Sequence, residues 1–270
     1  METGSLESKE KIITLENVTR KFKGKCVIDS VSHDFYKGDS IAFYGHNGCG
    51  KSTMLKLISG LIPLSGGDIH YHKNLSFSYV PEKFVGMEIE MIEYLEGIAR
   101  VEGVDHQVVE SLIKDFFLDS MIHTRMDKLS KGSLQKVGVI QAIMAPKDVI
   151  ILDEPLSGQD ADSQAVFISK IKELRKQGIT IFMSCHEKRL IDELSDKVFT
   201  IDNGKLVQSE FSNDIVYKVF VKADKNLQKR PDMKTKGNRY EITVAEPSLK
   251  ESVLRLYQEG WEIVGIEELN

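Results

Sequence analysis

The fold is decided by the stretch Gly45-His46-Asn47-Gly48-Cys49-Gly50-Lys51-Ser52, which matches the pattern G-x-x-x-x-G-K-[ST]. Residues 40–44 before it are mostly apolar, as in a buried strand, and apolar residues recur at helical spacing over 52–59. The glycines allow the loop to curl so that successive backbone N–H groups point inward, and the helix N-terminus adds partial positive charge. A loop of this kind between a strand and a helix predicts a cradle for phosphate.

Each residue type in this cradle has a chemical task. Lys51 supplies a full positive charge to the outer phosphates of a nucleotide, and the Ser52 hydroxyl can ligate Mg²⁺. Cys49 is interpreted as a small space-filling residue whose thiol, close to positive charge, would be unusually reactive. The strand–loop–helix context disfavours the alternative of a chance glycine-rich turn. The predicted nucleotide-binding residues here are Gly45, His46, Asn47, Gly48, Cys49, Gly50, Lys51, Ser52 and Thr53.

A second part of the site is predicted at the ends of two later strands. Residues 149–152 are apolar and lead directly into Asp153 and Glu154, where an open α/β sheet binds its ligands. Asp153 is expected in the shell of Mg²⁺, and Glu154 is expected to polarise the water that attacks the γ-phosphate. His186 follows the predicted strand 180–183 and is expected to polarise or sense the same phosphate. Alone, two acids after an apolar run indicate only a solvated strand end; beside the cradle they indicate catalysis.

In order and spacing, these residues resemble the ATP-binding subunits of ABC transporters over about the first 214 residues. Residues 129–133 (LSKGS) are similar to the family's signature sequence LSGGQ, and residues 157–160 (SGQD) to its D-loop, SGLD. The resemblance implies that Phe22 stacks on adenine and that Glu82, at the Q-loop, is a metal ligand. It also implies nucleotide contacts, across a dimer, from Ser130, Lys131, Gly132, Ser133 and Asp160.

The resemblance implies an ATPase that uses ATP and Mg²⁺, closes as a homodimer around two nucleotides and drives separately encoded membrane permease subunits. The Pro81-Glu82 pair is similar to that of exporters of this type. Glu82 replaces the usual glutamine, and Lys131, Ser133 and Gln159 also depart from the family pattern. Because Lys51, Asp153, Glu154 and His186 are all retained, an active hydrolase is expected. The alternatives are a non-transport ATPase of the same family, such as one for cluster assembly, and a catalytically weak ATP-binding regulatory module.

Strands alternating with helices predict an α/β fold with a mostly parallel, covered sheet. As a P-loop NTPase of this family, the chain is expected to add an antiparallel β subdomain and an inserted helical subdomain at about 82–145, within a cassette spanning 1–214. The pattern of predicted strands and helices changes after residue 214. Strands at 216–221, 240–244 and 261–266, a basic loop at 225–238 and a helix opened by a capping box at Ser248 predict a small α+β appendage spanning 215–270.

The composition of the chain limits which kinds of partner it is expected to bind. The chain has 270 residues, 41% hydrophobic and 29% charged, with a net charge of −5, which disfavours a nucleic-acid partner because phosphate binding needs concentrated positive charge. Three cysteines without a CxxC spacing predict a reducing, intracellular setting. No apolar stretch approaches the ~20 residues that span a bilayer. A peripheral position on the cytoplasmic face of a membrane, through the permease, is therefore expected.

Overall fold

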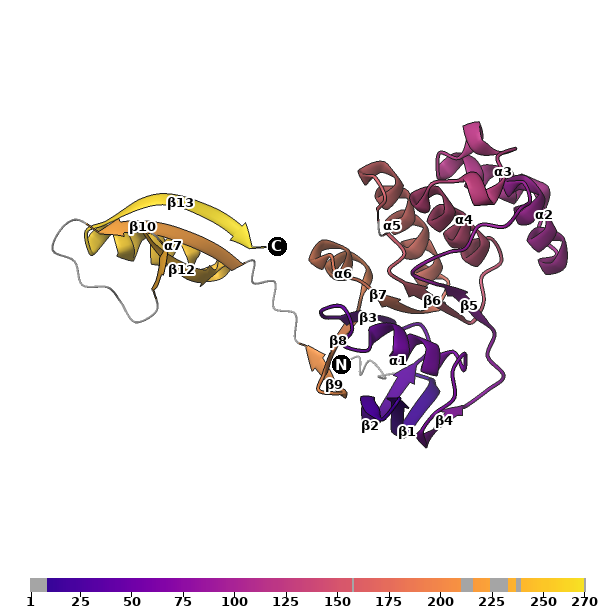
Figure 1. The fold of residues 1–270 in the computed structure, drawn as a ribbon, viewed down its shortest axis with the longest axis horizontal. Coiled ribbons are helices and arrows are strands. Elements are labelled where there is room, and N and C mark those ends of the chain that lie inside the picture. Colours follow the sequence, from indigo (N-terminus) through magenta and orange to yellow (C-terminus); the bar gives the residue numbers. More distant parts are fainter. Residues whose placement is uncertain (1–8, 157, 210–215, 224–232, 237–238, 270) are drawn as a thin grey trace, which may run out of the picture. The chain divides into compact units, whose positions relative to one another are not determined.

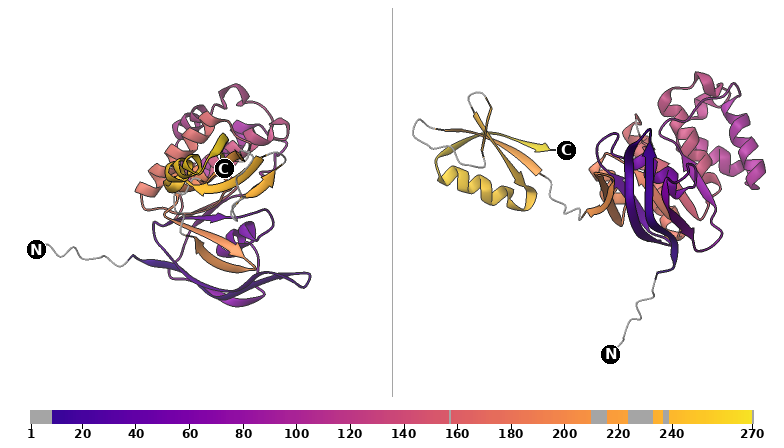
Figure 2. Two further views of the ribbon diagram at one scale, coloured as in Figure 1. Left: turned by 90° about the vertical axis from the view of Figure 1, so that its left-hand side faces the viewer. Right: turned by 60° about the horizontal axis from the view of Figure 1, so that its bottom comes forward.

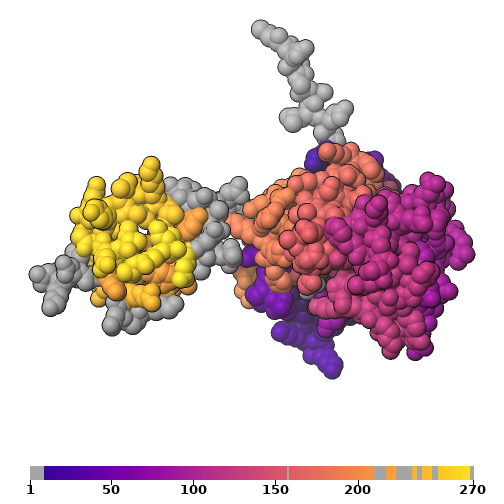
Figure 3. Space-filling view, turned by 90° about the horizontal axis from the view of Figure 1, so that it is seen from above, coloured from indigo at the N-terminus to yellow at the C-terminus, as the bar shows by residue number. Residues whose placement is uncertain are grey.

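The computed structural model describes residues 9–156, 158–209, 216–223, 233–236 and 239–269 (Figure 1). The chain divides into two compact units, Met1–Ser209 and Glu210–Asn270, and each is described here by itself. Figure 3 shows the surface of both units, coloured along the sequence. Among the described residues, no helix combines the length and the apolar character needed to cross a bilayer.

A six-stranded sheet forms the centre of the first unit, with the strand order β5-β6-β7-β3-β8-β9. The first five of these strands are mutually parallel, and β9 pairs antiparallel with β8. Every residue of β6 and β7 is buried, which explains why these strands are almost continuously apolar. The strands are β3 (Ser40–Tyr44), β5 (Phe77–Val80), β6 (Val149–Asp153), β7 (Thr180–Ser184), β8 (Lys197–Asp202) and β9 (Lys205–Ser209). The helices α1 (Lys51–Ile58), α5 (Ala161–Lys176) and α6 (Lys188–Leu194) follow β3, β6 and β7.

A three-stranded antiparallel sheet with the order β2-β1-β4 packs beside it. It consists of β1 (Lys11–Phe22), β2 (Lys25–Tyr36) and β4 (Gly66–Tyr71), of which β1 and β2 run side by side over most of their length (Figure 2). A hairpin turn of two residues joins β1 to β2. Lys23 and Gly24 both have positive φ, 47° and 83°, as the twist-matched hairpin turn requires.

The helices between β5 and β6 gather at one end of the first unit (Figure 1). They are α2 (Met91–Glu102), α3 (His106–Asp115), the 3₁₀ turns Asp119–Met121 and Met126–Lys128, and α4 (Lys131–Met144). Polar side chains begin them: Glu90 forms a capping box with Glu93 at α2, Asp105 accepts from the Gln107 N–H at α3, and Ser130 caps α4. The helices pack against one another in pairs, with α4 also contacting β5.

One apolar core joins the two sheets of the first unit. Ile13 and Phe35 from the antiparallel sheet are fully buried together with Phe43, Phe182 and Phe199 from the parallel sheet. The rings of Phe35 and Phe182 meet edge to face with centroids 4.9 Å apart. Burying each such side chain contributes about 1.5–3 kcal/mol, so this core holds the two sheets in a fixed relation around the loop after β3.

The second unit is an antiparallel sheet with the order β11-β12-β10-β13 and one helix, α7 (Glu246–Gln258). Its strands are β10 (Val216–Ala223), β11 (Lys234–Lys236), β12 (Arg239–Ala245) and β13 (Trp261–Leu269). A separate core forms from Val219, Val221, Ile242, Leu256 and Trp261 with their neighbours. Most of the predicted loop 225–238 lies outside the described residues, and β11 occupies part of it.

The predicted helix cap at Ser248 is wrong. The helix α7 begins at Glu246, directly after β12 ends at Ala245, so Ser248 lies within the first turn. Continuous pairing of β12 with β10 up to Ala245 fixes where the helix can begin. Tertiary strand pairing therefore decides this boundary over the local capping pattern.

Candidate nucleotide-binding site

The loop from β3 to α1 has backbone conformations that favour glycine. Gly45, Gly48 and Gly50 have φ values of 143°, 82° and 120°, in the region where L side chains are strained. At Gly50 a Cβ atom would also lie 3.2 Å from the Ile28 side chain, so the loop is closely backed by β2. Cys49 is half-buried and packs against the core cluster, as its space-filling interpretation requires. Local sequence thus shapes a loop that ends at the N-terminus of α1.

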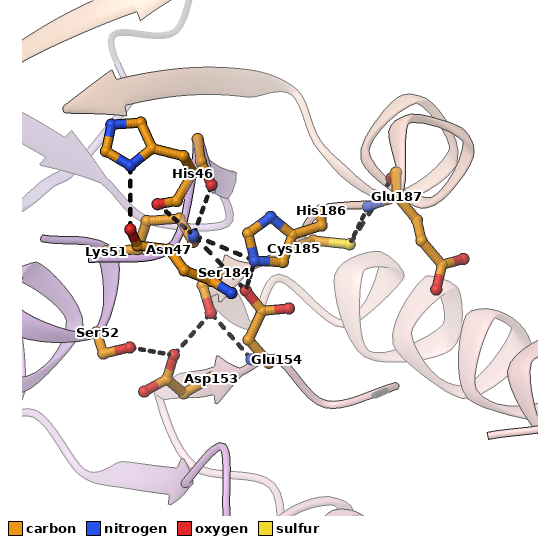
Figure 4. Close-up of polar contacts among 11 residues, drawn as sticks. His46, Asn47, Lys51, Ser52, Asp153, Glu154, Ser184, Cys185, His186 and Glu187 are labelled. Carbon is orange, nitrogen blue, oxygen red and sulfur yellow. Dashed lines mark hydrogen bonds and ion pairs between the residues drawn. The ribbon is translucent and has the colours of Figure 1, made fainter. Parts of the chain in front are cut away.

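Lys51 lies at the centre of the polar network in Figure 4. Its side chain is 6% exposed, and Nζ donates to the carbonyl of Gly45 at 2.6 Å and to that of His46 at 3.3 Å. The same Nζ is 3.3 Å from His186 Nε2 and 3.8 Å from Glu154 Oε1. The predicted phosphate-binding lysine, water-activating carboxylate and histidine therefore meet at one point.

The Asp153 carboxylate is held by three hydroxyl groups. Ser52 and Ser184 donate to Oδ1 at 2.9 and 2.7 Å, and Tyr79 donates to Oδ2 at 3.1 Å. Burial, followed by the nearby Asp153 charge, raises the pKa of Tyr79, so its hydroxyl remains a donor at neutral pH. The pairing of Ser52 with Asp153 brings two oxygen donors suited to Mg²⁺ next to the predicted phosphate loop.

Glu154, the next residue, adopts an uncommon backbone conformation with φ of 50°. Its carboxylate Oε1 is 2.8 Å from His186 Nε2. Burial raises the pKa of Glu154, against the opposing influence of His186 and Lys51. A carboxylate with a raised pKa is a stronger proton acceptor than an exposed one, as activation of a water molecule requires.

These groups open into a cavity of about 490 Å³. Ten of the predicted residues line it together with Val27: Phe22, Asn47, Gly48, Gly50, Lys51, Ser52, Thr53, Glu82, Glu154 and His186. Phe22 is 42% exposed, and the Arg20 guanidinium lies 4.4 Å from its ring centroid. Hydrogen-bond donors for phosphate, oxygen ligands for a metal ion and a partly exposed aromatic ring thus share one cavity, which fits a nucleoside triphosphate with Mg²⁺.

Other predicted residues do not line the cavity. Gly45, His46 and Cys49 belong to the loop, and Asp153 lies buried next to Ser52. The residues of the resemblance's signature and D-loop, namely Ser130, Lys131, Gly132, Ser133 and Asp160, are also absent from its lining.

The signature residues instead form an exposed helix end. Ser130 caps α4 by accepting from the Ser133 N–H at 3.1 Å, and the Ser133 side chain is buried beneath it. Asp160 caps α5 by accepting from the Ser163 N–H at 2.9 Å and lies 3.4 Å from Lys136 Nζ. Hydrogen bonds from the N–H and the hydroxyl of Ser163 lower the pKa of Asp160 to about 2. Within one chain, both residues therefore organise helix N-termini.

Sequence reasoning missed three residues of the site. Val27 lines the cavity from β2, a strand that was not predicted. Tyr79 and Ser184 bind Asp153 from the two strands that flank β6. One signal was present in the sequence: Ser184 lies two residues before His186, and Tyr79 three residues before Glu82, so both lie close to residues already expected to face the ligand.

Comparison with known proteins identifies the family. Residues 28–157 match the family model described as "ABC transporter". An uncharacterised ABC transporter ATP-binding protein of Methanocaldococcus jannaschii, MJ1023, is 31% identical over 77% of this chain and 80% of its own length. The zinc import ATP-binding protein ZnuC of Rickettsia conorii is 34% identical over 76% of this chain and 88% of its own length.

Solved structures confirm the predicted α/β fold. An ATP-binding subunit of an ABC transporter aligns with a TM-score of 0.67 and 24% identity, covering 75% of this chain and 91% of the neighbour. The ATP-binding cassette MJ0796, solved as a dimer after hydrolysis with ADP and Pi, aligns with a TM-score of 0.67 and 17% identity, covering 74% of this chain and 99% of the neighbour. On the strength of these relatives, this chain belongs to the ABC transporter family as an ATP-binding subunit that hydrolyses ATP with Mg²⁺.

Proposed function

We propose that two copies of this chain close around two Mg-ATP molecules, and that closure drives a permease of separate membrane subunits in the direction of export. One observation carries the proposal: the cavity holds Lys51, Glu154 and His186, whereas the exposed helix end at Ser130 lies outside it. The first turn of α4 contains no acidic residue, so its N-terminus is suited to an anion. A second copy related by a two-fold axis would supply its Ser130 to this cavity, and the first copy would do the same in return.

The residues of the cavity have different roles in the proposed hydrolysis. When bound, Mg²⁺ neutralises charge on the phosphates, and Ser52, Asp153 and Glu82 are the oxygen donors that would hold it. Lys51 exchanges the loop carbonyls, its present partners, for phosphate oxygens. Glu154 accepts the proton of the attacking water, for which its raised pKa suits it.

Mixing two inactive variants tests the composite site. Lys51→Ala removes the phosphate charge, and Ser130→Asp keeps the helix cap while placing a negative charge against the phosphate. Each variant alone is expected to lack ATPase activity. In a mixed dimer, the Ser130→Asp copy supplies an intact cradle with Lys51, and the Lys51→Ala copy supplies an intact helix end with Ser130. These two halves form one complete site, so the mixture regains activity. A mixture no more active than its components rules out the shared site. Ser130→Asn is the control, because asparagine also caps the helix but adds no negative charge.

A surface for the permease is also available on the first unit. Between β5 and α2, Val85, Met87 and Ile89 are 76%, 41% and 39% exposed. Two backbone hydrogen bonds attach their segment to the turn at Met126–Lys128: the Met87 and Ile89 carbonyls accept from the Asp127 and Met126 N–H groups at 3.1 and 2.9 Å. Apolar side chains on a fixed segment, directly after Glu82, are placed to pass motion between the cavity and a partner.

Co-purification tests this surface. Val85→Asp is expected to lose an integral membrane partner that the unmodified protein retains, while ATP binding is unchanged. Val101→Asp is the matched control, because Val101 on α2 is 82% exposed and lies in another segment. A protein that retains no integral membrane subunit, with or without these changes, favours the non-transport ATPase instead.

Export is inferred from the Pro81-Glu82 pair, whereas curated relatives that include ZnuC are named zinc import proteins. The direction is measured with the co-purified permease in inside-out vesicles. ATP-dependent accumulation of substrate inside these vesicles supports export, and ATP-dependent loss from them overturns it.

A further inference from the structure

One buried hydroxyl joins the two acidic residues at the end of β6. Ser184 is the last residue of β7, is fully buried and pairs with Asp153 across the two parallel strands. Its Oγ donates to Asp153 Oδ1 at 2.7 Å and accepts from the Glu154 N–H at 2.9 Å. Figure 4 shows this hydroxyl between the two residues. A single side chain thus contacts the predicted metal ligand and the backbone of the predicted base.

The backbone at Glu154 needs such support. A non-glycine residue with a φ of 50° is in the left-handed region, which is unfavourable for L-amino acids. The Glu154 N–H is directed at β7, where it meets both the hydroxyl and, at 3.3 Å, the carbonyl of Ser184. This turn moves the Glu154 side chain away from the strand direction and toward His186.

The Asp153 carboxylate needs support for a different reason. Its Oδ1 accepts from both Ser52 and Ser184, while Oδ2 accepts from Tyr79. Ser52 is itself a predicted metal ligand, so its hydroxyl must turn toward the ion. Ser184 lies behind the carboxylate, lines no part of the cavity and can keep its hydrogen bond when the site is loaded.

We infer that Ser184 is a positioning residue whose hydroxyl fixes the Asp153 carboxylate and the left-handed turn at Glu154 in one relative orientation. The inference rests on the roles proposed above for Asp153 and Glu154. It explains why a polar side chain lies at a fully buried strand end where an apolar residue would otherwise be expected. Ser184 does not line the cavity, so its hydroxyl is inferred to act through its two neighbours, Asp153 and Glu154.

The first experiment compares Ser184→Ala with Ser184→Thr, which keeps the hydroxyl on a residue favourable in strands. Ser40→Ala is the matched control, because Ser40 is also a fully buried serine, at the start of β3, whose hydroxyl donates to the Leu194 carbonyl instead. Ser184→Ala is expected to lower kcat by about tenfold, with the KM for ATP little changed, because the loop and Lys51 are intact. Ser184→Thr is expected to retain most of the rate. Equal losses in Ser184→Ala and Ser40→Ala would overturn the inference.

A second readout does not depend on activity. The melting temperature of the ADP-loaded protein is followed as Mg²⁺ is added, which gives the Mg²⁺ concentration at half-saturation. In Ser184→Ala this concentration is expected to rise about tenfold, because Asp153 is no longer oriented, while ADP affinity in EDTA is unchanged. An unchanged half-saturation concentration refutes the inference. Mg-ADP binding needs only one copy, so this result is independent of the variant-mixing experiment.

A double substitution isolates the backbone role. Glycine adopts a positive φ without strain, so in a Glu154→Gly background the turn no longer needs the Ser184 hydroxyl to the same extent. Ser184→Ala should therefore lower the melting temperature less in Glu154→Gly than in the unmodified chain. Equal decreases in the two backgrounds contradict the role at Glu154.

Discussion

At the scale of single residues, the candidate site holds several charged groups close together. Lys51 is nearly buried, and the Gly45 carbonyl, Glu154 and His186 surround its Nζ atom. Burying a charge is favourable only when partners compensate it, and here the loop carbonyls do so. In the proposed complex with a nucleotide, phosphate oxygens replace these carbonyls and the lysine needs little reorganisation.

Replacing Lys51 with alanine is expected to weaken nucleotide binding itself. A lost hydrogen bond between charged groups costs about 1.5–3 kcal/mol, which corresponds to about a tenfold to hundredfold rise in Kd. Isothermal titration calorimetry with ADP measures this directly. Lys176→Ala, at the exposed end of α5, serves as the control of equal charge change. Unchanged affinity in Lys51→Ala would remove the lysine from the phosphate site.

The raised pKa of Glu154 predicts the pH dependence of hydrolysis. A general base acts when ionised, so the rate falls as pH decreases through the pKa of this carboxyl. Because burial raises that pKa, the acid limb of kcat is expected to have its midpoint above about 4.3, the ordinary value for glutamate. Steady-state rates across pH measure it, with circular dichroism to verify folding. A midpoint at or below the ordinary value contradicts the assignment.

At the scale of elements, the residues of the candidate site lie at the ends of helices and strands. The chain leaves β3 through a glycine loop into α1, and it leaves β6 at Asp153 and Glu154. Parallel strands deliver these ends to the same edge of the sheet. The starts of α4 and α5 are capped by Ser130 and Asp160, which keeps their positions defined.

The cap of α5 predicts a change in stability. Asp160→Ala is expected to lower the free energy of unfolding by about 1 kcal/mol, whereas Asp160→Asn, also a good cap, retains most of it. The folded pKa of Asp160, about 2, lies below its unfolded value, so its contribution is present above about pH 3.9 and is lost as pH falls through 2. Urea unfolding at neutral pH measures the difference. Equal stability of the alanine and asparagine variants would argue against the cap.

At the scale of the whole molecule, each unit has a core of its own. The first unit is held by the cluster around Phe35 and Phe182, and the second by the cluster around Val219 and Trp261. Separate cores predict that the units fold independently.

Deleting residues 210–270 is therefore expected to leave the first unit folded and able to bind ADP. Thermal unfolding and calorimetry of the shortened chain measure both properties. Loss of cooperative unfolding after the deletion would show that the first unit depends on the second.

The proposed ATP-dependent assembly predicts that a variant unable to hydrolyse ATP stays dimeric in Mg-ATP. Glu154→Gln removes the base but retains the cradle, so ATP remains bound and holds two copies together. Size-exclusion chromatography with light scattering should report twice the monomer mass in Mg-ATP and the monomer mass in ADP. The double variant Lys51→Ala/Glu154→Gln, which lacks the cradle charge, should remain monomeric. A monomeric Glu154→Gln protein in saturating Mg-ATP contradicts the proposed dimer.

Local sequence alone predicted the phosphate loop, because its conformation depends on the glycines at positions 45, 48 and 50 and on the strand and helix that flank it. The buried strand ending in Asp153 and Glu154 was equally readable, since its apolar run and its acids are contiguous. By contrast, β2 was missed because polar residues such as His33 and Asp34 interrupt its apolar alternation. Val27 reaches the cavity from β2, in the other sheet of the first unit, and only the packing of the two sheets brings it there. Only tertiary structure revealed that Tyr79 and Ser184 bind Asp153, because the order β5-β6-β7 brings together strands that are far apart in the chain. Hydrogen bonds across such strands depend on sheet order and register, which local periodicity does not encode.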